Sequence, residues 1–135
     1  QFDLRKRSAY YWTEAWGGQT DESFVNQVLC LGGRGQAHDF LHSLLAIEQQ
    51  LGRVRDPQKK YGPRIIDIDL LFFNQEVIQS PKLEVPHPRL HLRRFTLAPL
   101  MEISPQLNHP VFNLTISELN QKCSDPLEVK TLNFN

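Results

Sequence analysis

The pattern of apolar and polar residues divides the chain into short segments of different periodicity. Residues 4–13 and residues 24–31 are rich in aromatic and β-prone side chains, and the segment between them is polar and contains glycine. This pattern is typical of two strands that pair as a hairpin around a long loop. From residue 37 to residue 51 the apolar residues recur at helical spacing, and Gly52 stands where a helix commonly ends. We therefore expect a β-hairpin followed by one amphipathic helix.

Prolines divide the second half of the chain into shorter predicted elements. Residues 64–73 (RIIDIDLLFF) form a strongly apolar run that predicts a strand, and a short second strand is expected at residues 77–78. The proline-rich segment 80–89 is expected to be extended and loop-like. Pro88 can serve as the first residue of a helix that continues to about residue 103, with an interruption at Pro99.

The C-terminal part of the chain carries a clear helix start. Thr115 and Glu118 form a T-x-x-E pattern, which is the signature of a capping box and predicts a short helix. Residues 127–134 are expected to form a last edge strand. Strands mixed with helices in this order, with the hairpin first, indicate an α+β fold in a single domain spanning residues 1–135.

Length and composition are those of an ordinary globular domain, and they exclude several function classes. The 135 residues are 40% hydrophobic and 22% charged, which is enough for one core and argues against disorder. Fifteen Lys and Arg residues balance fifteen Asp and Glu residues, which argues against a general nucleic-acid-binding protein. No apolar run reaches the roughly 20 residues of a membrane helix. Cys30 and Cys123 match no metal-binding spacing, so we expect reduced thiols in a cytoplasmic protein.

The strongest chemical signal is the pair Asp67 and Asp69 within the apolar run. Residues two apart on a strand share a face and lie about 6.6 Å apart along it. Ile65 and Phe73 have the same parity, which indicates that this face is not solvated, so two ionised carboxylates there would repel each other and lose hydration. A divalent cation removes that cost, and oxygen ligands without His or Cys favour Mg²⁺. The alternative is a pair of surface aspartates on an exposed strand.

Two basic segments flank this acidic pair. Five basic residues accompany one acidic residue between positions 53 and 64, and four accompany one between positions 82 and 94. Carboxylates that hold Mg²⁺, with Arg or Lys nearby, are the composition of a nucleoside triphosphate site. The chain contains neither a Walker A motif nor a G-x-G-x-x-G motif, so neither of these glycine-rich loops would hold the phosphates.

The residues around the acidic pair resemble a known enzyme family. Residues 61–71 (YGPRIIDIDLL) resemble the signature of the 6-hydroxymethyl-7,8-dihydropterin pyrophosphokinases, and the resemblance continues in residues 8–13, 24–26, 47–55 and 85–89. It implies a ferredoxin-like α+β fold with an antiparallel sheet and helices. The first strand and helix of the family are not recognisable in this chain, so we expect the domain to be N-terminally incomplete and the native protein to carry them.

The resemblance also implies an activity and a set of residues around ATP. The reaction would transfer pyrophosphate from ATP to the hydroxymethyl group of the pterin, with release of AMP, in folate biosynthesis. Asp67 and Asp69 would hold two Mg²⁺ ions, and Arg53 and Arg64 would contact the phosphates during transfer. The residues that the resemblance places around ATP are Glu48, Arg55, Lys60, Arg64, Leu70, Lys82, His87 and Arg93.

A second set of residues would bind the pterin. By resemblance, the ring would stack between Phe24 and Phe95 and hydrogen-bond the amide of Asn26. Further hydrogen bonds would come from Thr13 and from the backbone of Ala15 and Trp16. Without the resemblance, both phenylalanines would be interpreted as core residues. The histidines that we expect to lie on the surface or in loops are His38, His42, His91 and His109.

Two other function classes compete with the enzyme. One is a non-catalytic nucleotide- or pterin-binding module derived from this fold, and the other is a ferredoxin-like RNA-binding domain. The zero net charge and the missing K/R-G-F-type aromatic motif argue against RNA. We expect a cytoplasmic, monomeric enzyme whose partners are its two small-molecule substrates, ATP and the pterin, and not nucleic acid or a membrane.

Overall fold

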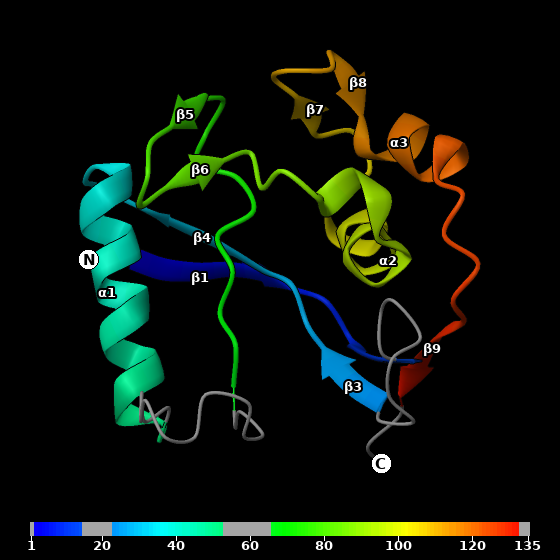
Figure 1. Ribbon diagram of the computed structural model, residues 1–135, viewed down its shortest axis with the longest axis horizontal. Coiled ribbons are helices and arrows are strands. Elements are labelled where there is room, and N and C mark those ends of the chain that lie inside the picture. Colours follow the sequence, from blue (N-terminus) through cyan, green and yellow to red (C-terminus); the bar gives the residue numbers. More distant parts are fainter. Residues whose placement is uncertain (1, 15–22, 53–65, 133–135) are drawn as a thin grey trace.

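The predicted N-terminal hairpin forms, but each of its two strands is divided in two (Figure 1). The computed structural model describes residues 2–14, 23–52 and 66–132. The first predicted strand is split into β1 (Phe2–Arg7) and β2 (Tyr10–Glu14), and the returning strand into β3 (Ser23–Asn26) and β4 (Leu29–Gly33). Strand β1 pairs with β4, and β2 pairs with β3, both antiparallel.

A buried serine explains the division of the hairpin. The backbone N–H of Ser8 donates to the carbonyl of Val28 at 2.9 Å, and the Ser8 hydroxyl accepts from the N–H of Val28 at 2.9 Å. The second bond takes the Val28 N–H that a continuous ladder would direct to the Ser8 backbone carbonyl, so the ladder between the two predicted strands is interrupted at this point. The sequence pattern shows the β-prone residues on both sides but not this local competition.

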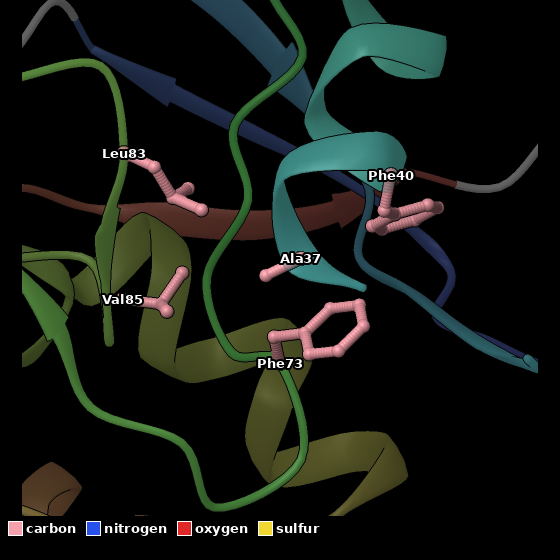
Figure 2. Close-up of a cluster of buried hydrophobic side chains, with 5 residues drawn as sticks. All are labelled: Ala37, Phe40, Phe73, Leu83 and Val85. Carbon is pink, nitrogen blue, oxygen red and sulfur yellow. The ribbon is translucent and has the colours of Figure 1, made fainter. Parts of the chain in front are cut away.

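The predicted amphipathic helix is confirmed as α1 (Ala37–Gln50), and Gly52 follows it with a positive φ of 99°. Its apolar residues Ala37 and Phe40 pack with the buried side chains Phe73, Leu83 and Val85, as Figure 2 shows. This cluster joins α1 to the segment that carries the two aspartates and to the hairpin that follows it. The helix is therefore one wall of the candidate site.

The second half of the chain departs from two predictions. Residues 66–73 are extended but belong to no strand, because their backbone bonds go to a side chain of α1 and to the N–H of His87 instead of a ladder. The predicted helix from Pro88 is also wrong, because a 3₁₀ turn, η2 (Leu90–Leu92), precedes α2 (Arg94–Ile103). Pro99 lies inside α2 and does not end it.

Short paired strands complete this half of the chain. Strand β5 (Ile78–Gln79) pairs with β6 (Glu84–Val85), and β7 (Asn108–His109) pairs with β8 (Leu114–Thr115). The peptide bond before Pro86 is cis. Helix α3 (Ile116–Lys122) packs on α2 around a second core, whose buried residues are Leu90, Leu97, Leu100, Ile116 and Leu119. The predicted last strand is β9 (Val129–Leu132), which pairs with β2.

The three α-helices and the antiparallel strand pairs in the described part of the chain confirm the α+β class. The described strands form one three-stranded sheet, in the order β3-β2-β9, and three two-stranded sheets. The ferredoxin-like arrangement and the additional N-terminal strand and helix stay predictions. Within the described ranges, no helix combines the length and the apolar character that a membrane span requires.

The capping box of α3 gives a test of stability. The Thr115 hydroxyl accepts from the N–H of Glu118 at 3.2 Å, and the Glu118 carboxylate accepts from the N–H of Thr115 at 3.0 Å, as the sequence predicts. Thr115→Ala removes the first bond, so we expect the free energy of unfolding to fall by about 1 kcal/mol. Urea unfolding measures it, with Gln121→Ala, an exposed position on the same helix, as the control. Equal stability of the two variants would contradict the prediction.

Candidate active site

The two aspartates lie on the extended segment 66–73, and both are exposed. Their neighbours Ile66, Ile68 and Leu70 are partly buried, so the side chains alternate between the protein and the outside. The prediction that the aspartate face would be withdrawn from solvent is therefore wrong. Within the described residues the segment joins no sheet, and only its end at Phe73 is buried in a core cluster. An exposed pair is accessible to a ligand, and the repulsion between the two carboxylates is reduced by solvent.

Two hydrogen bonds fix this segment on either side of Asp69. The N–H of Ile68 donates to the Glu48 carboxylate of α1 at 2.7 Å. The carbonyl of Leu71 accepts from the N–H of His87 at 2.8 Å. The backbone that carries the aspartates is thus bonded to α1 on one side and to the His87 loop on the other.

Glu48 is the most unusual residue of α1, because it is a charged residue that is only 2% exposed. The sequence places it within the apolar stripe of the helix, and a carboxylate there requires a partner. The structure supplies the Ile68 N–H as one such partner. The bond therefore holds the backbone at Ile68, which lies between the two aspartates in the sequence. The expected nucleotide contact of Glu48 stays a prediction.

Asp69 interacts electrostatically with His87 of the next loop and with Arg93 at the start of α2. The pKa of His87 is lowered mainly by burial, while Asp69 acts in the opposite direction and Arg93 and Arg89 add to the lowering. Burial also lowers the pKa of Arg93, with Arg89 adding to this and Asp69 opposing it. The structure therefore brings Asp69, His87 and Arg93 into one electrostatic neighbourhood. Arg89 acts on both His87 and Arg93, although the sequence indicates Arg89 only as part of a basic segment.

Other residues expected around ATP differ in how they lie. Lys82 is exposed at the turn between β5 and β6, and Leu70 packs against the core cluster beside α1. Four expected ATP or catalytic residues, and two pterin residues, lie outside the described residues: Arg53, Arg55, Lys60, Arg64, Ala15 and Trp16. Their roles stay predictions. Among the described residues, no group of three or more His, Cys, Asp or Glu side chains could hold a metal ion.

The expected pterin residues lie on the three-stranded sheet and at the start of α2. Thr13 on β2 is directly opposite Phe24 on β3, and Asn26 is two residues further along the same strand. Phe24 is 48% exposed, so its interpretation as a core residue is excluded. Phe95 is partly buried, and the guanidinium carbon of Arg93 lies 5.5 Å from the centre of its ring. Stacking of a ligand between the two phenylalanines stays a prediction.

A cluster of histidines and aromatic rings lies next to His87. His109 is 3% exposed, contrary to the prediction of a surface position, because its ring stacks on Phe112 with centroids 4.5 Å apart. His91 packs edge-on against the same phenylalanine. A cavity of about 110 Å³ adjoins these residues and reaches His87 and Glu84. The sequence could not reveal this cluster, since its members come from three separate elements.

The buried carboxylate of Glu48 gives a second prediction. Glu48→Ala leaves the Ile68 N–H without this acceptor and leaves space at a buried position, so the free energy of unfolding should fall by about 1–3 kcal/mol. Glu48→Gln keeps an acceptor oxygen and should lose less. Urea unfolding compares both variants with Gln49→Ala, an exposed neighbour on α1. A Glu48→Ala variant as stable as Gln49→Ala would contradict the role of this bond.

The two histidines His91 and His109 give a prediction of how stability depends on pH. Burial lowers the pKa of His91 and of His109, so the folded state disfavours the charged form of each ring. As the pH falls through about 6.5, the unfolded chain binds protons before the folded one, and stability must decrease. His109→Asn keeps an acceptor for the N–H groups of Val111 and Phe112 but does not titrate.

We expect the free energy of unfolding to fall between pH 7.5 and pH 5.5, and to fall less steeply in the His109→Asn variant. Urea titrations at several pH values measure both slopes. Identical slopes for the two proteins would show that His109 does not contribute to the pH dependence.

Comparisons with known proteins show which family the chain resembles. The family model described as 7,8-dihydro-6-hydroxymethylpterin-pyrophosphokinase matches residues 1–105. The chain is 36% identical over 116 residues to the 2-amino-4-hydroxy-6-hydroxymethyldihydropteridine pyrophosphokinase of Aquifex aeolicus, which covers 86% of this chain and 71% of that protein. It is 34% identical over 117 residues to the protein of the same name from Synechocystis, covering 87% of this chain and 58% of that protein.

A third relative is longer. The folic acid synthesis protein fol1 of Pneumocystis carinii is 37% identical over 120 residues, which are 89% of this chain but 16% of that protein. The chain thus spans 71%, 58% and 16% of the lengths of these three relatives. The match to the family model includes the aspartates, the basic segments and the pterin residues. The chain therefore belongs to the 7,8-dihydro-6-hydroxymethylpterin-pyrophosphokinase family, as its sequence motifs predict.

Proposed function

We propose that this enzyme transfers pyrophosphate from ATP to 6-hydroxymethyl-7,8-dihydropterin, giving AMP and the pterin pyrophosphate for folate biosynthesis. In this reaction the hydroxyl oxygen of the pterin bonds to the β-phosphorus of ATP, and its proton is released. The bond from the β-phosphorus to the bridging oxygen of AMP breaks. One observation supports the proposal beyond family membership: Asp69, one of the two exposed aspartates, interacts electrostatically with the guanidinium of Arg93 and with the imidazole of His87.

The donor set fits the magnesium that the reaction requires. Asp67 and Asp69 provide carboxylate oxygens, which Mg²⁺ prefers, and the pair is exposed. Because Mg²⁺ in proteins commonly keeps waters and uses one or two carboxylates together with substrate phosphates, two aspartates are sufficient as protein ligands. We propose that they hold two Mg²⁺ ions. When bound, the metal neutralises the charge that develops on the phosphate oxygens.

The basic residues would position the triphosphate. Arg93 and His87 interact electrostatically with Asp69, so a phosphate bound at the aspartates would be within the field of both. Burial of Arg93 strengthens its interaction with an anion because less water competes for the guanidinium. Lys82, Arg53 and Arg64 would add further contacts. Phosphoryl transfer needs little covalent help from the protein, so such positioning supplies much of the rate.

The pterin would lie between the sheet and the start of α2. Phe24 offers an exposed aromatic face, Phe95 offers a second, and Asn26 offers a hydrogen-bonding amide on the same sheet, whereas the buried Thr13 hydroxyl is already bonded to the carbonyl of Glu128. Aromatic faces give affinity for a flat heterocycle, and a few fixed polar groups give orientation. We also propose that the enzyme is monomeric and cytoplasmic, with small molecules as its only partners, and that its sheet completes a ferredoxin-like fold.

The alternative, a non-catalytic binding module, differs from the enzyme in one measurable way. Both would bind ATP and the pterin, but only the enzyme would release AMP. No observation on the described residues favours the module, and the exposed aspartates favour chemistry at the phosphates.

The aspartates give the decisive test of this proposal. We expect AMP release that depends on the pterin, and a fall in kcat on the order of 10³-fold in Asp67→Ala and Asp69→Ala, because the metal ligands stabilise the transferred group. Asp39→Ala, at an exposed position in the first turn of α1, is the matched control. Chromatography of the nucleotides at increasing Mg²⁺ concentration measures the effect. Wild-type turnover by either aspartate variant would refute the site, and binding without AMP release would favour the module.

A further inference from the structure

The C-terminal segment from Cys123 to Leu132, here called the strap, connects two parts of the proposed substrate site. It leaves α3, passes the first turn of α2 and ends as β9 on the three-stranded sheet (Figure 1). The family model matches residues 1–105 and does not include the strap. We propose that the strap is a positioning element, which holds the start of α2 at a fixed distance from β2 so that both can contact the pterin. This inference rests on the proposed function.

One end of the strap is bonded to the first residue of α2. The Asp125 carboxylate accepts from the N–H of Arg94 at 3.0 Å, and so satisfies a helix N–H that the N-cap residue Arg93 does not bond with its own side chain. The Arg94 guanidinium donates to the carbonyl of Cys123 at 2.7 Å and to the carbonyl and amide oxygens of Asn120 at 2.8 Å and 2.7 Å. Arg94 stands between Arg93 and Phe95, so these bonds fix the expected ATP and pterin contacts.

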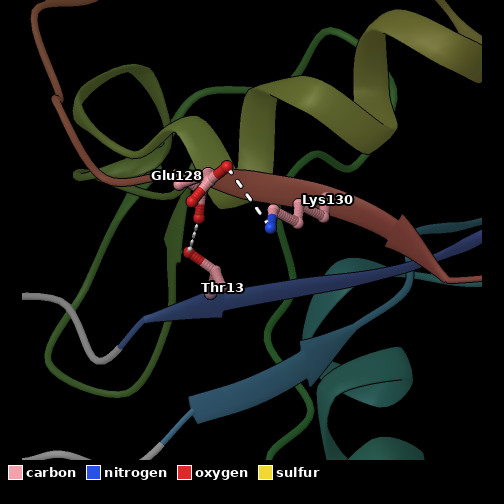
Figure 3. A network of polar contacts seen from close by, with 3 residues as sticks. All are labelled: Thr13, Glu128 and Lys130. Carbon is pink, nitrogen blue, oxygen red and sulfur yellow. Dashed lines mark hydrogen bonds and ion pairs between the residues drawn. The ribbon is translucent and has the colours of Figure 1, made fainter.

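The other end of the strap is bonded to the pterin side of the sheet. Strand β9 pairs with β2, with Val129 opposite Thr13. The Thr13 hydroxyl donates to the carbonyl of Glu128 at 3.2 Å, as Figure 3 shows. Thr13 is 1% exposed, so its side chain is committed to this contact. The strap therefore shapes the position of β2 at the residue expected to bind the pterin.

The strap is too short to allow much separation between these two ends. From Asp125 to Glu128 the chain makes three residue steps, which span at most about 11 Å when fully extended. A second bond stiffens this stretch, because the Asp125 carboxylate also accepts from the N–H of Leu127 at 3.0 Å. The start of α2 and Thr13 are thus joined by a short stretch of chain that is bonded at both ends.

The far end of α2 is anchored independently, which makes the strap the restraint on the substrate end. The Glu102 carboxylate accepts from the N–H of Ala9 at 3.1 Å and from the Tyr11 hydroxyl at 2.6 Å. Burial, together with this contact, raises the pKa of Tyr11 to about 12, so the hydroxyl stays protonated as a donor. With the strap released, α2 would stay attached at Glu102 and through Leu97 in the second core, but the start of the helix at Arg94 would lose its hydrogen bonds to the strap.

The test compares two strap variants with a control from the same segment. Asp125→Ala removes both backbone bonds, while Asp125→Asn keeps one acceptor oxygen and should give an intermediate result. Arg94→Ala keeps the N–H that bonds Asp125 but removes the guanidinium bonds to Cys123 and Asn120, so it loosens the strap at its other contact with α2. Ser124→Ala, at an exposed position between the bonded residues, is the matched control. Calorimetry measures pterin binding in the presence of Mg²⁺ and a non-hydrolysable ATP analogue, at a temperature where every variant is folded.

We expect the Kd for the pterin to rise about tenfold in Asp125→Ala and Arg94→Ala, about threefold in Asp125→Asn, and not at all in Ser124→Ala. Hydrogen exchange should become faster in the first turn of α2 and stay unchanged in α1. A purely structural strap would lower the folded fraction without changing the Kd of the folded protein, and this result would overturn the proposal. Wild-type protein that binds both ligands without releasing AMP would refute the proposed function and not the strap.

Discussion

The geometry of the site depends on one buried hydrogen bond, from the N–H of Ile68 to the carboxylate of Glu48. The segment that carries the aspartates joins no sheet, so it lacks the ladder that normally fixes an extended chain. The bond to α1, with the bond from His87 to Leu71, takes the place of that ladder. Burying a carboxylate costs free energy, and this cost is offset only where the carboxylate accepts hydrogen bonds. The burial of the Glu48 carboxylate on the apolar face of α1 is therefore the free-energy cost of holding the two exposed aspartates in place.

Much of the fold follows from local sequence patterns. Helix α1 and the capping box of α3 form as predicted, because both depend on residues within one or two turns of each other. The interruption at Ser8 and the late start of α2 were not predictable, because they depend on bonds to residues distant in the sequence, such as Val28 and Asp125. The extended segment 66–73 resembles a strand in composition and lacks only the partner.

The candidate site shows the same difference between local patterns, which the sequence reveals, and contacts between distant residues, which it does not. The aspartate pair and the basic segments are visible in the sequence because they are contiguous, and the family match includes them. The prediction that the aspartate face is withdrawn from solvent was wrong. Alternation along a strand shows which residues share a face, but it does not show whether another element covers that face. The contribution of Arg89 and the burial of His109 arise from loops that meet only in the folded chain. No local sequence pattern predicts the proposed strap, because nothing in the residues around Asp125 indicates a contact with Arg94.

The contact between Arg93 and Phe95 has a consequence for the geometry of catalysis. The guanidinium lies over one face of the aromatic ring, so in the proposed site a planar molecule would stack on the opposite face. Two residues at the start of one helix would then separate an anionic substrate from a flat one, with the ring between them.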